Sequence, residues 1–304
     1  MNKNWSLIIG TTIFSIIILL GITAPYLPIV DANLTEHLLG KDSDGKPITP
    51  AFAPSKEFPL GSNFKGVDIL SLLLIGTKET MIVIFSIALL RYMLALPLGI
   101  GAFYFRAIRG ILACWNQLFS YLPPIFFVGM MVGIPFILFS KFHAFWMILI
   151  ISIIEVGRVA DILLNNMKST NEKPFVESGI VSGCTRITLF RKYLWPHLLP
   201  QVMTNFVNDL GRILFLIAQL GIVYVFIDHE FFSTLNRGSY EVSNTSNSWP
   251  TLLADILQNI WGKTWIPFSA ITIITITLLS LHLIANGLER YFQKKINKSE
   301  GVGV

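Results

Sequence analysis

Six long apolar runs alternate with polar stretches along this chain of 304 residues. A transmembrane helix needs about 20 predominantly apolar residues, because each residue advances about 1.5 Å through roughly 30 Å of hydrocarbon. The pattern therefore predicts an all-α polytopic membrane protein with six transmembrane helices. The predicted spans lie at about 7–24, 79–104, 111–138, 144–164, 200–227 and 266–287.

The first apolar run is also compatible with a cleaved signal peptide, because its length is close to that of a signal sequence. Pro25 follows Ala24 directly, however, and the run contains no A-x-A cleavage site. We therefore expect an uncleaved first span.

The polar stretches divide the chain into three regions. Residues 1–76 hold the first span and a proline-rich segment that we expect on the extracytoplasmic side. Residues 77–290 hold spans two to six and form the membrane core, with a second polar stretch at about 228–265. Residues 291–304 form a basic cytoplasmic tail.

Lysine and arginine in short loops predict the orientation, because cytoplasmic loops carry an excess of both residues. With six spans, the basic residues of the short loops and the tail fall on one side of the membrane. The amino and carboxyl termini are therefore predicted to be cytoplasmic. Outside the tail, the supporting residues are Lys3, Arg106, Arg109, Lys168, Lys173, Arg186, Arg191 and Lys192.

Composition strengthens the membrane assignment. Only 13% of the residues are charged, against about 25% in a typical soluble domain. Two soluble domains would have too few charges for their surfaces, and a disordered chain would contain fewer aromatic residues. The net charge of +5 is accounted for by the positive-inside rule, so we expect the lipid bilayer and no nucleic acid as a partner.

No sequence motif indicates catalysis, a cofactor or a metal site. The Gly-Lys-Thr triplet at 262–264 resembles the end of a phosphate-binding loop, but Leu257 occupies the position where that loop needs glycine. The His-Glu pair at 229–230 begins a zinc-protease pattern, but Ser233 replaces its second histidine. We therefore expect a non-catalytic chain that binds no cofactor or metal of its own.

The cytoplasmic segment at about 165–199 is longer than a connection between two spans requires. Its sequence is compatible with a short amphipathic helix, a bend at Gly183 and a second helix that returns to the membrane. Val176, Ile180 and Val181 lie along one face of the first helix. Two explanations fit this pattern: the helix docks on another protein, or it lies on lipid headgroups.

We single out three charged residues near the middle of predicted spans, Arg91 in the second and Asp209 and Arg212 in the fifth. Charged groups at this depth are costly and usually face a bundle interior or a cavity. Asp209 and Arg212 are three residues apart and are able to pair on one helix face. The three residues form either a polar translocation path suited to a zwitterion such as a peptide, or ion pairs that fix helix packing, including a bridge between Asp209 and Arg91.

The segment from Phe175 to Pro196 resembles the EAA loop of ABC importer permeases. The family pattern is E-A-A, three residues, G, nine residues and then I-x-L-P. Glu177, Gly183 and Pro196 stand at the corresponding positions. The chain departs from the pattern at Ser178, Gly179, Tyr193 and Trp195.

Other stretches resemble the second, C-type membrane subunit of dipeptide, oligopeptide and nickel importers. The P-L-G-S-N-F-K-G-V-D-I-L-S sequence at 59–71 is similar to the P-L-G-T-D-x-x-G-R-D-x-L-S signature of that branch. Val67 replaces the signature arginine, and Gln219 stands where a glutamate is common. Further similar stretches are Pro97-Leu98-Gly99, Ser248-Trp249-Pro250 and Asn286-Gly287-Leu288-Glu289-Arg290.

The resemblance implies that the loop helix is a coupling helix for an ATP-hydrolysing partner. It implies a homologous second permease subunit, two ATPase subunits that bind ATP and Mg²⁺, and an extracytoplasmic substrate-binding protein. The implied substrate is a peptide, with nickel or another metal chelate as the alternative, and the implied location is the cytoplasmic (inner) membrane of a prokaryote. The implied coupling interface comprises Val176, Glu177, Ser178, Gly179, Ile180, Gly183 and Arg186.

A secondary carrier driven by an ion gradient is the alternative from another class of transporter. Arg91, Asp209 and Arg212 would then relay the coupling ion. Such carriers often contain repeated halves, and this sequence shows no internal repeat.

Overall fold

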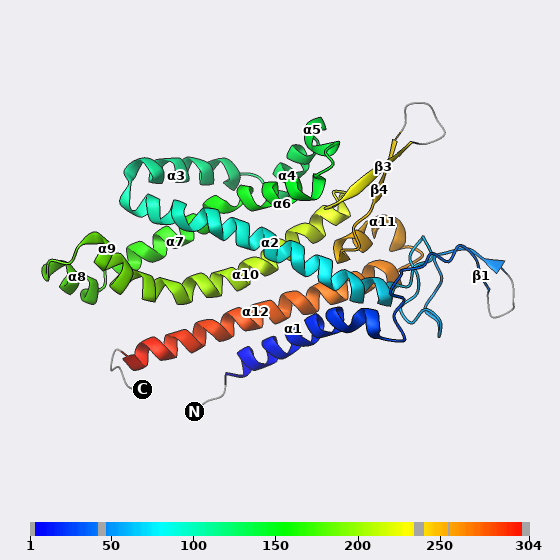
Figure 1. Cartoon of the computed structure of the whole chain (residues 1–304), viewed down its shortest axis with the longest axis horizontal. Helices are drawn as coiled ribbons and strands as arrows, with labels where there is room; N and C mark the ends of the chain where they lie inside the picture. Colours follow the sequence, from blue (N-terminus) through cyan, green and yellow to red (C-terminus); the bar gives the residue numbers. More distant parts are fainter. Residues whose placement is uncertain (1–3, 42–46, 234–239, 255, 300–304) are drawn as a thin grey trace.

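Four long helices run roughly along the long axis of the molecule (Figure 1). The computed structural model describes residues 4–41, 47–233, 240–254 and 256–299, so Lys3 and the end of the predicted tail lie outside the described residues. The chain is mainly helical, as the apolar pattern predicts. The long helices are α1 (Trp5–Thr23), α2 (Ile69–Tyr104), α10 (Trp195–Ile222) and α12 (Trp265–Ser299).

Shorter helices connect the long ones and pack mainly against α2 and α10. They are α3 (Arg106–Ser120), α4 (Pro124–Val132), α5 (Pro135–Leu138), α6 (His143–Ile154), α7 (Val156–Asn171), α8 (Pro174–Val181), α9 (Arg186–Leu189) and α11 (Ile256–Asn259), with the single turns η1 (Ala24–Tyr26), η2 (Phe190–Leu194) and η3 (Trp249–Leu253).

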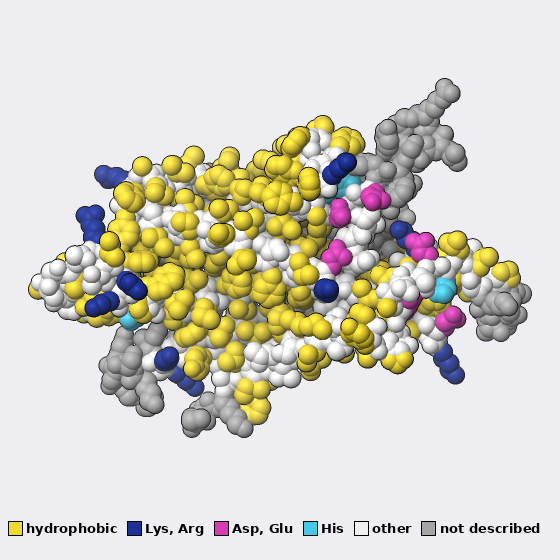
Figure 2. Space-filling view, in the orientation of Figure 1, with side chains coloured by type: hydrophobic (Ala, Val, Ile, Leu, Met, Phe, Trp, Pro, Cys, Tyr) yellow, Lys and Arg dark blue, Asp and Glu magenta, His cyan; other side chains and the backbone are white. Residues whose placement is uncertain are grey.

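The two ends of the molecule differ in structure and charge. Helices α8 and α9 lie at the same end as both chain termini (Figure 1). Figure 2 shows that the middle of the visible face is largely apolar and that Lys and Arg side chains gather at the α8 end. The termini and the α8–α9 segment therefore share one side, and the assignment of that side to the cytoplasm stays a prediction.

Two small antiparallel strand pairs lie at the opposite end, where the sequence pattern predicts only loops. Strand β1 (Gly40–Lys41) pairs with β2 (Pro47–Ile48), and β3 (His229–Ser233) pairs with β4 (Tyr240–Asn244). The register of the second pair places His229 opposite Asn244. The all-helical prediction thus holds for the bundle but not for these two polar segments.

Several helices are long and apolar enough to cross a membrane. In the described part of the chain, three single helices meet that condition by length and composition, and a bent pair is a fourth candidate. The single helices are Trp5–Tyr26, Ile69–Tyr104 and Trp265–Lys295. They contain the first, second and sixth predicted spans, while the total of six stays a prediction.

The predicted third span at 111–138 is not one straight helix. The structure divides it into α3, α4 and α5, and the axis bends by 88° between Arg106–Phe119 and Pro124–Val132. Pro123 and Pro124 follow the end of α3. Proline lacks a backbone N–H and disfavours the helical conformation in the residue before it, so two successive prolines account for the break.

The remaining predicted spans are helical with shifted boundaries. The fourth, at 144–164, consists of α6 and α7, which meet at Glu155, and the fifth lies in α10, which ends at Ile222. Helix α12 continues to Ser299. The described part of the predicted 291–304 tail is therefore an extension of the last helix.

Helices α1 and α12 pack closely through small residues. A Cβ atom added at Gly10 would lie 2.8 Å from the backbone nitrogen of Ile284, and one added at Gly287 would lie 2.6 Å from the Cα atom of Leu7. The side chain of Asn4 donates a hydrogen bond of 2.6 Å to the carbonyl of Gly287. Small residues allow membrane helices to approach each other, and here they fix α1 to α12.

Trp249 fixes the second polar segment to α2. Its side chain is fully buried, and its indole nitrogen donates a hydrogen bond of 2.8 Å to the carbonyl of Leu73. The Glu79 carboxylate on α2 accepts a hydrogen bond of 2.9 Å from the backbone nitrogen of Asn247 and another from the Ser246 hydroxyl. The Ser-Trp-Pro stretch that stood out in the sequence therefore has a structural role in this packing.

Two histidines hold the β3–β4 pair against the start of α6. The ring centroids of His143 and His229 are 4.0 Å apart, and the Nε2 atom of His229 lies 3.2 Å from the carbonyl oxygen of Leu138. Burial, followed by the nearby His143 ring, lowers the pKa of His229, while the Leu138 carbonyl and Asp228 oppose that shift. The neutral form of His229 therefore belongs to the packed hairpin.

We expect Gly287→Ala to destabilise the protein by about 1–3 kcal/mol, because the new methyl group has no space between α12 and α1. Gly110→Ala on α3 is the matched control, since an added Cβ there meets nothing within 4 Å. Thermal unfolding in detergent measures both variants. Equal unfolding temperatures for the two variants would contradict the close packing of α1 on α12.

We expect the contact between the hairpin and α6 to weaken as the pH falls. The folded pKa of His229 is below its ordinary value of about 6.5, so the contact is fully stable above that value and is lost as the pH falls through the folded pKa. The protection factors of residues 225–229, which are hydrogen-exchange rates corrected for the intrinsic rate at each pH, should fall on acidification in the wild-type protein and much less in His229→Gln. His143 is retained in both proteins, so identical pH profiles would show that His229 is not the titrating group.

Candidate functional site

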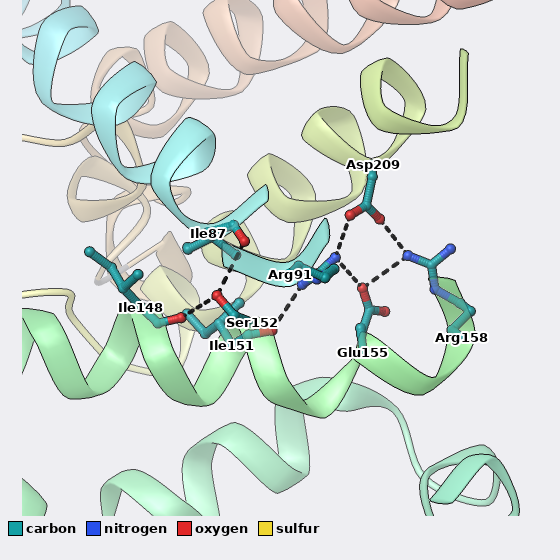
Figure 3. Close-up of polar contacts among 8 residues, drawn as sticks. All are labelled: Ile87, Arg91, Ile148, Ile151, Ser152, Glu155, Arg158 and Asp209. Carbon is teal, nitrogen blue, oxygen red and sulfur yellow. Dashed lines mark hydrogen bonds and ion pairs between the residues drawn. The ribbon is translucent and has the colours of Figure 1, made fainter. Parts of the chain in front are cut away.

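Four charged side chains from three parts of the bundle form one buried ion cluster (Figure 3). Arg91 comes from α2, Glu155 from the junction of α6 and α7, Arg158 from α7 and Asp209 from α10. One terminal nitrogen of Arg91 lies 2.7 Å from Glu155 and 2.9 Å from Asp209. Arg158 also contacts both carboxylates, at 3.2 Å from Glu155 and at hydrogen-bond distance from Asp209.

Burial explains why all four members of the ion cluster are needed. The side chain of Arg91 is 0% exposed and that of Asp209 is 2% exposed. A buried charge that lacks a partner is strongly destabilising, whereas two positive and two negative groups that alternate in contact neutralise one another. The cluster therefore joins α2, α7 and α10 without a net charge in the core.

The break between α6 and α7 supplies a further acceptor to the ion cluster. The last four carbonyl groups of a helix have no partner within that helix, and α6 ends at Ile154. The second terminal nitrogen of Arg91 donates a hydrogen bond of 2.9 Å to one of these carbonyls, that of Ile151. The hydroxyl of Ser152 donates to Ile148 and Ile87 at the same junction (Figure 3). The helix break thus creates part of the polar environment that Arg91 needs.

The sequence identified two members of the ion cluster and overlooked the other two. Asp209 bridges to Arg91, which is the contact that the packing explanation anticipates. The predicted pair of Asp209 with Arg212 does not form, because both oxygens of Asp209 are engaged by Arg91 and Arg158. Glu155 and Arg158 lie inside the predicted fourth span. Charged residues are costly at bilayer depth, so their presence in an apolar span was the signal that would have identified them.

Arg212 instead faces a groove between α7, α10 and α12. The cavity has a volume of about 490 Å³. Asn205, Asn208 and Asp209 join Arg212 on its α10 wall, at spacings of three and four residues that place them on one helix face. Other lining residues are Tyr92, Arg158, Asn166, Phe215, Leu278 and His282.

A second groove lies beside the first and shares Arg158 with it. Its volume is about 660 Å³, and it extends between α7 and the turn that joins α3 to α4. Glu155 and Asp161 contribute carboxylates to its lining, together with Asn116. The two grooves therefore differ in charge: the first contains two arginines and one carboxylate, and the second contains one arginine and two carboxylates.

The predicted docking helix is present as α8. Pro174 begins it and Glu177 lies in its first turn, where a negative charge interacts favourably with the helix dipole. Gly183 follows the helix with a φ of +76°, a left-handed conformation that favours glycine and turns the chain toward α9. The short helix and the glycine bend that the sequence predicts are both confirmed.

The exposed face of α8 differs from the predicted one. Val176 is fully buried with Leu163, Met167, Leu194 and Leu198, so it anchors α8 to its own chain and cannot belong to an exposed docking surface. Ile180 is 54% exposed and Val181 is 83% exposed. The exposed elbow consists of Glu177, Ser178, Ile180, Val181, Gly183, Arg186 and Ile187.

Two departures from the EAA pattern compensate each other. Gly179 is buried, and a Cβ atom added to it would lie 3.1 Å from the Cζ atom of Tyr193. Gly179 stands where the pattern has alanine, and Tyr193 stands where it has isoleucine. The larger ring at 193 therefore occupies the space that the missing methyl group at 179 leaves free.

The described residues contain no group of three or more His, Cys, Asp or Glu side chains that could hold a metal ion. The ion cluster and the first groove offer charge pairing and hydrogen bonding. This arrangement suits binding and passage of a polar solute.

We expect Asp209→Asn to destabilise the protein by about 3–5 kcal/mol, because it leaves the buried Arg91 without its full compensation. Asp161→Asn on α7 is the matched control and should cost less than about 1 kcal/mol, since Asp161 is partly exposed and accepts one hydrogen bond from Asn165. Chemical unfolding in detergent micelles measures both. Similar losses in the two variants would show that the ion cluster does not stabilise the bundle.

Comparison with known proteins assigns a family. The chain matches the family described as "binding-protein-dependent transport system inner membrane component" over residues 92–298, more than half of its length. A search of curated proteins finds no match. The matched range includes the second groove, α8 and most of the ion cluster, and it begins after the 59–71 stretch. The chain therefore belongs to the ABC-importer permeases, a family of integral membrane transport components that are generally non-catalytic.

Proposed function

We propose that this chain is one of two homologous permease subunits of an ABC importer for peptides, in the cytoplasmic membrane of a prokaryote. It forms half of the translocation pathway and works with two ATPase subunits and an extracytoplasmic substrate-binding protein. ATP and Mg²⁺ bind to the ATPase subunits. The observation that carries this proposal is the exposed elbow of α8 and α9, which projects at the end of the bundle where both chain termini lie (Figure 1).

The elbow has the properties of a docking element. Ile180, Val181 and Ile187 present apolar side chains at its surface, and Glu177 and Arg186 add charges beside them. An amphipathic helix that lays apolar residues into a groove of a partner is a common mode of recognition. The alternative, a helix resting on lipid headgroups, uses the same apolar residues but does not need the glycine bend that separates α8 from α9.

The elbow is mechanically connected to the grooves. The π-helical turn η2 leads directly into α10, and α10 carries Asp209 and Arg212. Arg212 is 17 residues beyond Trp195, which corresponds to about 26 Å along a continuous helix. Movement of the elbow on an ATPase subunit would therefore shift the polar face of α10 within the bundle.

We place Arg91, Asp209 and Arg212 in two different parts of the translocation pathway. Arg91 and Asp209 are buried in the neutral ion cluster and hold the pathway helices together. Arg212 lines the first groove and belongs to the surface that a solute would meet. This division assigns the packing role and the transport role to different residues of the same helix.

The proposal of peptides as substrate rests on the resemblance of residues 59–71 to the dipeptide, oligopeptide and nickel branch and its C-type subunit. Nickel or another metal chelate is the alternative substrate. Selectivity in such importers lies largely in the substrate-binding protein, which we expect at the end of the bundle that carries the two strand pairs.

A carrier driven by an ion gradient is the competing function. It would need a titratable group that is free to exchange an ion, but Asp209 is paired with two arginines, and Glu155 contacts the same two. Uptake by this chain alone in ATP-free vesicles with an imposed proton gradient would favour the carrier. ATP-dependent uptake that requires the ATPase subunits would favour the importer.

The coupling role is tested by the double variant Glu177→Gln and Gly183→Ala. We expect recovery of this chain with a tagged ATPase subunit to fall about tenfold, because the variant removes an exposed charge and strains the bend at a φ of +76°. The matched control combines Glu172→Gln with Gly110→Ala, which makes the same changes of residue type outside the elbow. Unaltered ATPase recovery and uptake in the elbow variant would contradict the proposal.

A further inference from the structure

We propose that the first groove, between α7, α10 and α12, is a binding site within the membrane for the carboxylate group of a small polar solute, with Arg212 as its anchoring cation. This inference rests on the proposed function in so far as the solute is the transported substrate. The site adds selection by the membrane subunit itself to the selection made by the binding protein.

The charge balance of the groove favours an anion. Its lining contains Arg158 and Arg212 but only one carboxylate, Asp209. Both oxygens of Asp209 are occupied, one by Arg91 and the other by Arg158. Among the described residues, Arg212 makes no ion pair, so its guanidinium is available to a ligand.

The polar groups beside Arg212 are placed to orient a bound solute. Asn205 and Asn208 are partly buried on the same face of α10, and in the described part of the chain no hydrogen bond engages their side-chain amides. An arginine binds a carboxylate through two parallel N–H donors, and adjacent amides are able to accept from an amino group or donate to a second oxygen. Phe215, Leu278 and Leu281 provide an apolar wall, so the groove combines a few polar groups with apolar surface in the way that small-molecule sites do.

The size and depth of the groove favour a water-soluble ligand. A volume of about 490 Å³ is sufficient for a small molecule. Arg212 lies ten residues before the end of α10 at Ile222, or about 15 Å along the helix. In the predicted fifth span, at about 200–227, Arg212 is near the middle, and we therefore expect that the anionic headgroup of a lipid at the bilayer surface does not reach it.

The second groove serves as an internal contrast. It shares Arg158 with the first groove but adds Asp161, which lies outside the neutral ion cluster and repels an anion. The carboxylate of a solute therefore belongs in the groove that contains Arg212. Arg212 recognises the carboxylate alone, whether it belongs to a peptide or to another solute, including a metal chelate with carboxylate ligands.

The test measures ligand-induced thermal stabilisation of the full chain in phosphatidylcholine nanodiscs. The probes are L-alanyl-L-alanine and its carboxyl-terminal amide, with ionic strength matched by NaCl. A ligand that binds the folded state stabilises it by RT ln(1 + [L]/Kd), so the rise in unfolding temperature with ligand concentration gives the Kd. We expect dialanine to stabilise the wild-type protein and the amide to bind about tenfold more weakly, since it lacks the carboxylate.

Variants of Arg212 test whether stabilisation by dialanine depends on this residue. Arg212→Gln should weaken dialanine binding by about tenfold or more, whereas Arg212→Lys should retain part of it because the charge remains. Arg106→Gln, which removes an exposed arginine of α3 outside the groove, should leave binding unchanged. Each shift is taken relative to the unliganded variant, so a lower intrinsic stability of Arg212→Gln does not imitate the result.

Three outcomes would overturn the proposal. They are equal stabilisation by dialanine and its amide, equal stabilisation of the wild-type protein and Arg212→Gln, and loss of the dialanine effect when phosphatidylglycerol is added, which would show that a lipid anion occupies the groove. The elbow variant Glu177→Gln with Gly183→Ala should retain full dialanine stabilisation. A failed coupling experiment and a failed groove experiment therefore remain distinguishable.

Discussion

The neutral cluster of two arginines and two carboxylates is the interaction on which the arrangement of this permease depends. Arg91 is completely buried, and both terminal nitrogens of its guanidinium have acceptors. Helix α10 supplies Asp209, the α6–α7 junction supplies Glu155, and the end of α6 supplies the carbonyl of Ile151. These contacts define the relative positions of the helices. Apolar packing alone would define those positions less strictly.

The ion cluster has a buried side and a side that faces the two grooves. Its buried side stabilises the contact between α2 and α10, while Arg158, whose side chain is 30% exposed, reaches the surface of both grooves. Because the charges are balanced inside the cluster, the character of the first groove is determined by Arg212 and the asparagines beside it. Helix α10 thus carries a member of the ion cluster and a groove-lining residue three positions apart, and it connects both to the elbow through η2.

Much of the helical bundle was predictable because the cost of burying an open backbone in lipid leaves a clear apolar pattern in the sequence. That pattern located α1, α2 and α12 well. The pattern joined α3, α4 and α5 into one span, because hydropathy does not report the direction of a helix axis. Pro123 and Pro124 were the local signs of the bend. The strand pairs were missed because polar segments of low periodicity carry little information about pairing.

The candidate site was predicted in part. Arg91 and Asp209 were recognised because isolated charges stand out in apolar runs, but their geometry depends on contacts across the bundle that spacing along one helix does not encode. Spacing along the helix left open whether Asp209 pairs with Arg212 or with Arg91, and the structure shows the pair with Arg91. Val176 was placed on the docking face because it shares a helical stripe with Ile180, yet the packing of α8 against α7 and η2 buries only the first of the two.

The tight glycine contacts between α1 and α12 also determine where conformational probes should be attached. Both chain termini extend from this one helix pair, on the side where the elbow lies (Figure 1). Fluorophores fused to the two ends would therefore travel together and give a constant signal throughout a transport cycle. A fluorophore on the elbow, paired with one at the end of α12, would instead test whether the elbow and α10 move relative to the α1–α12 pair within the same subunit.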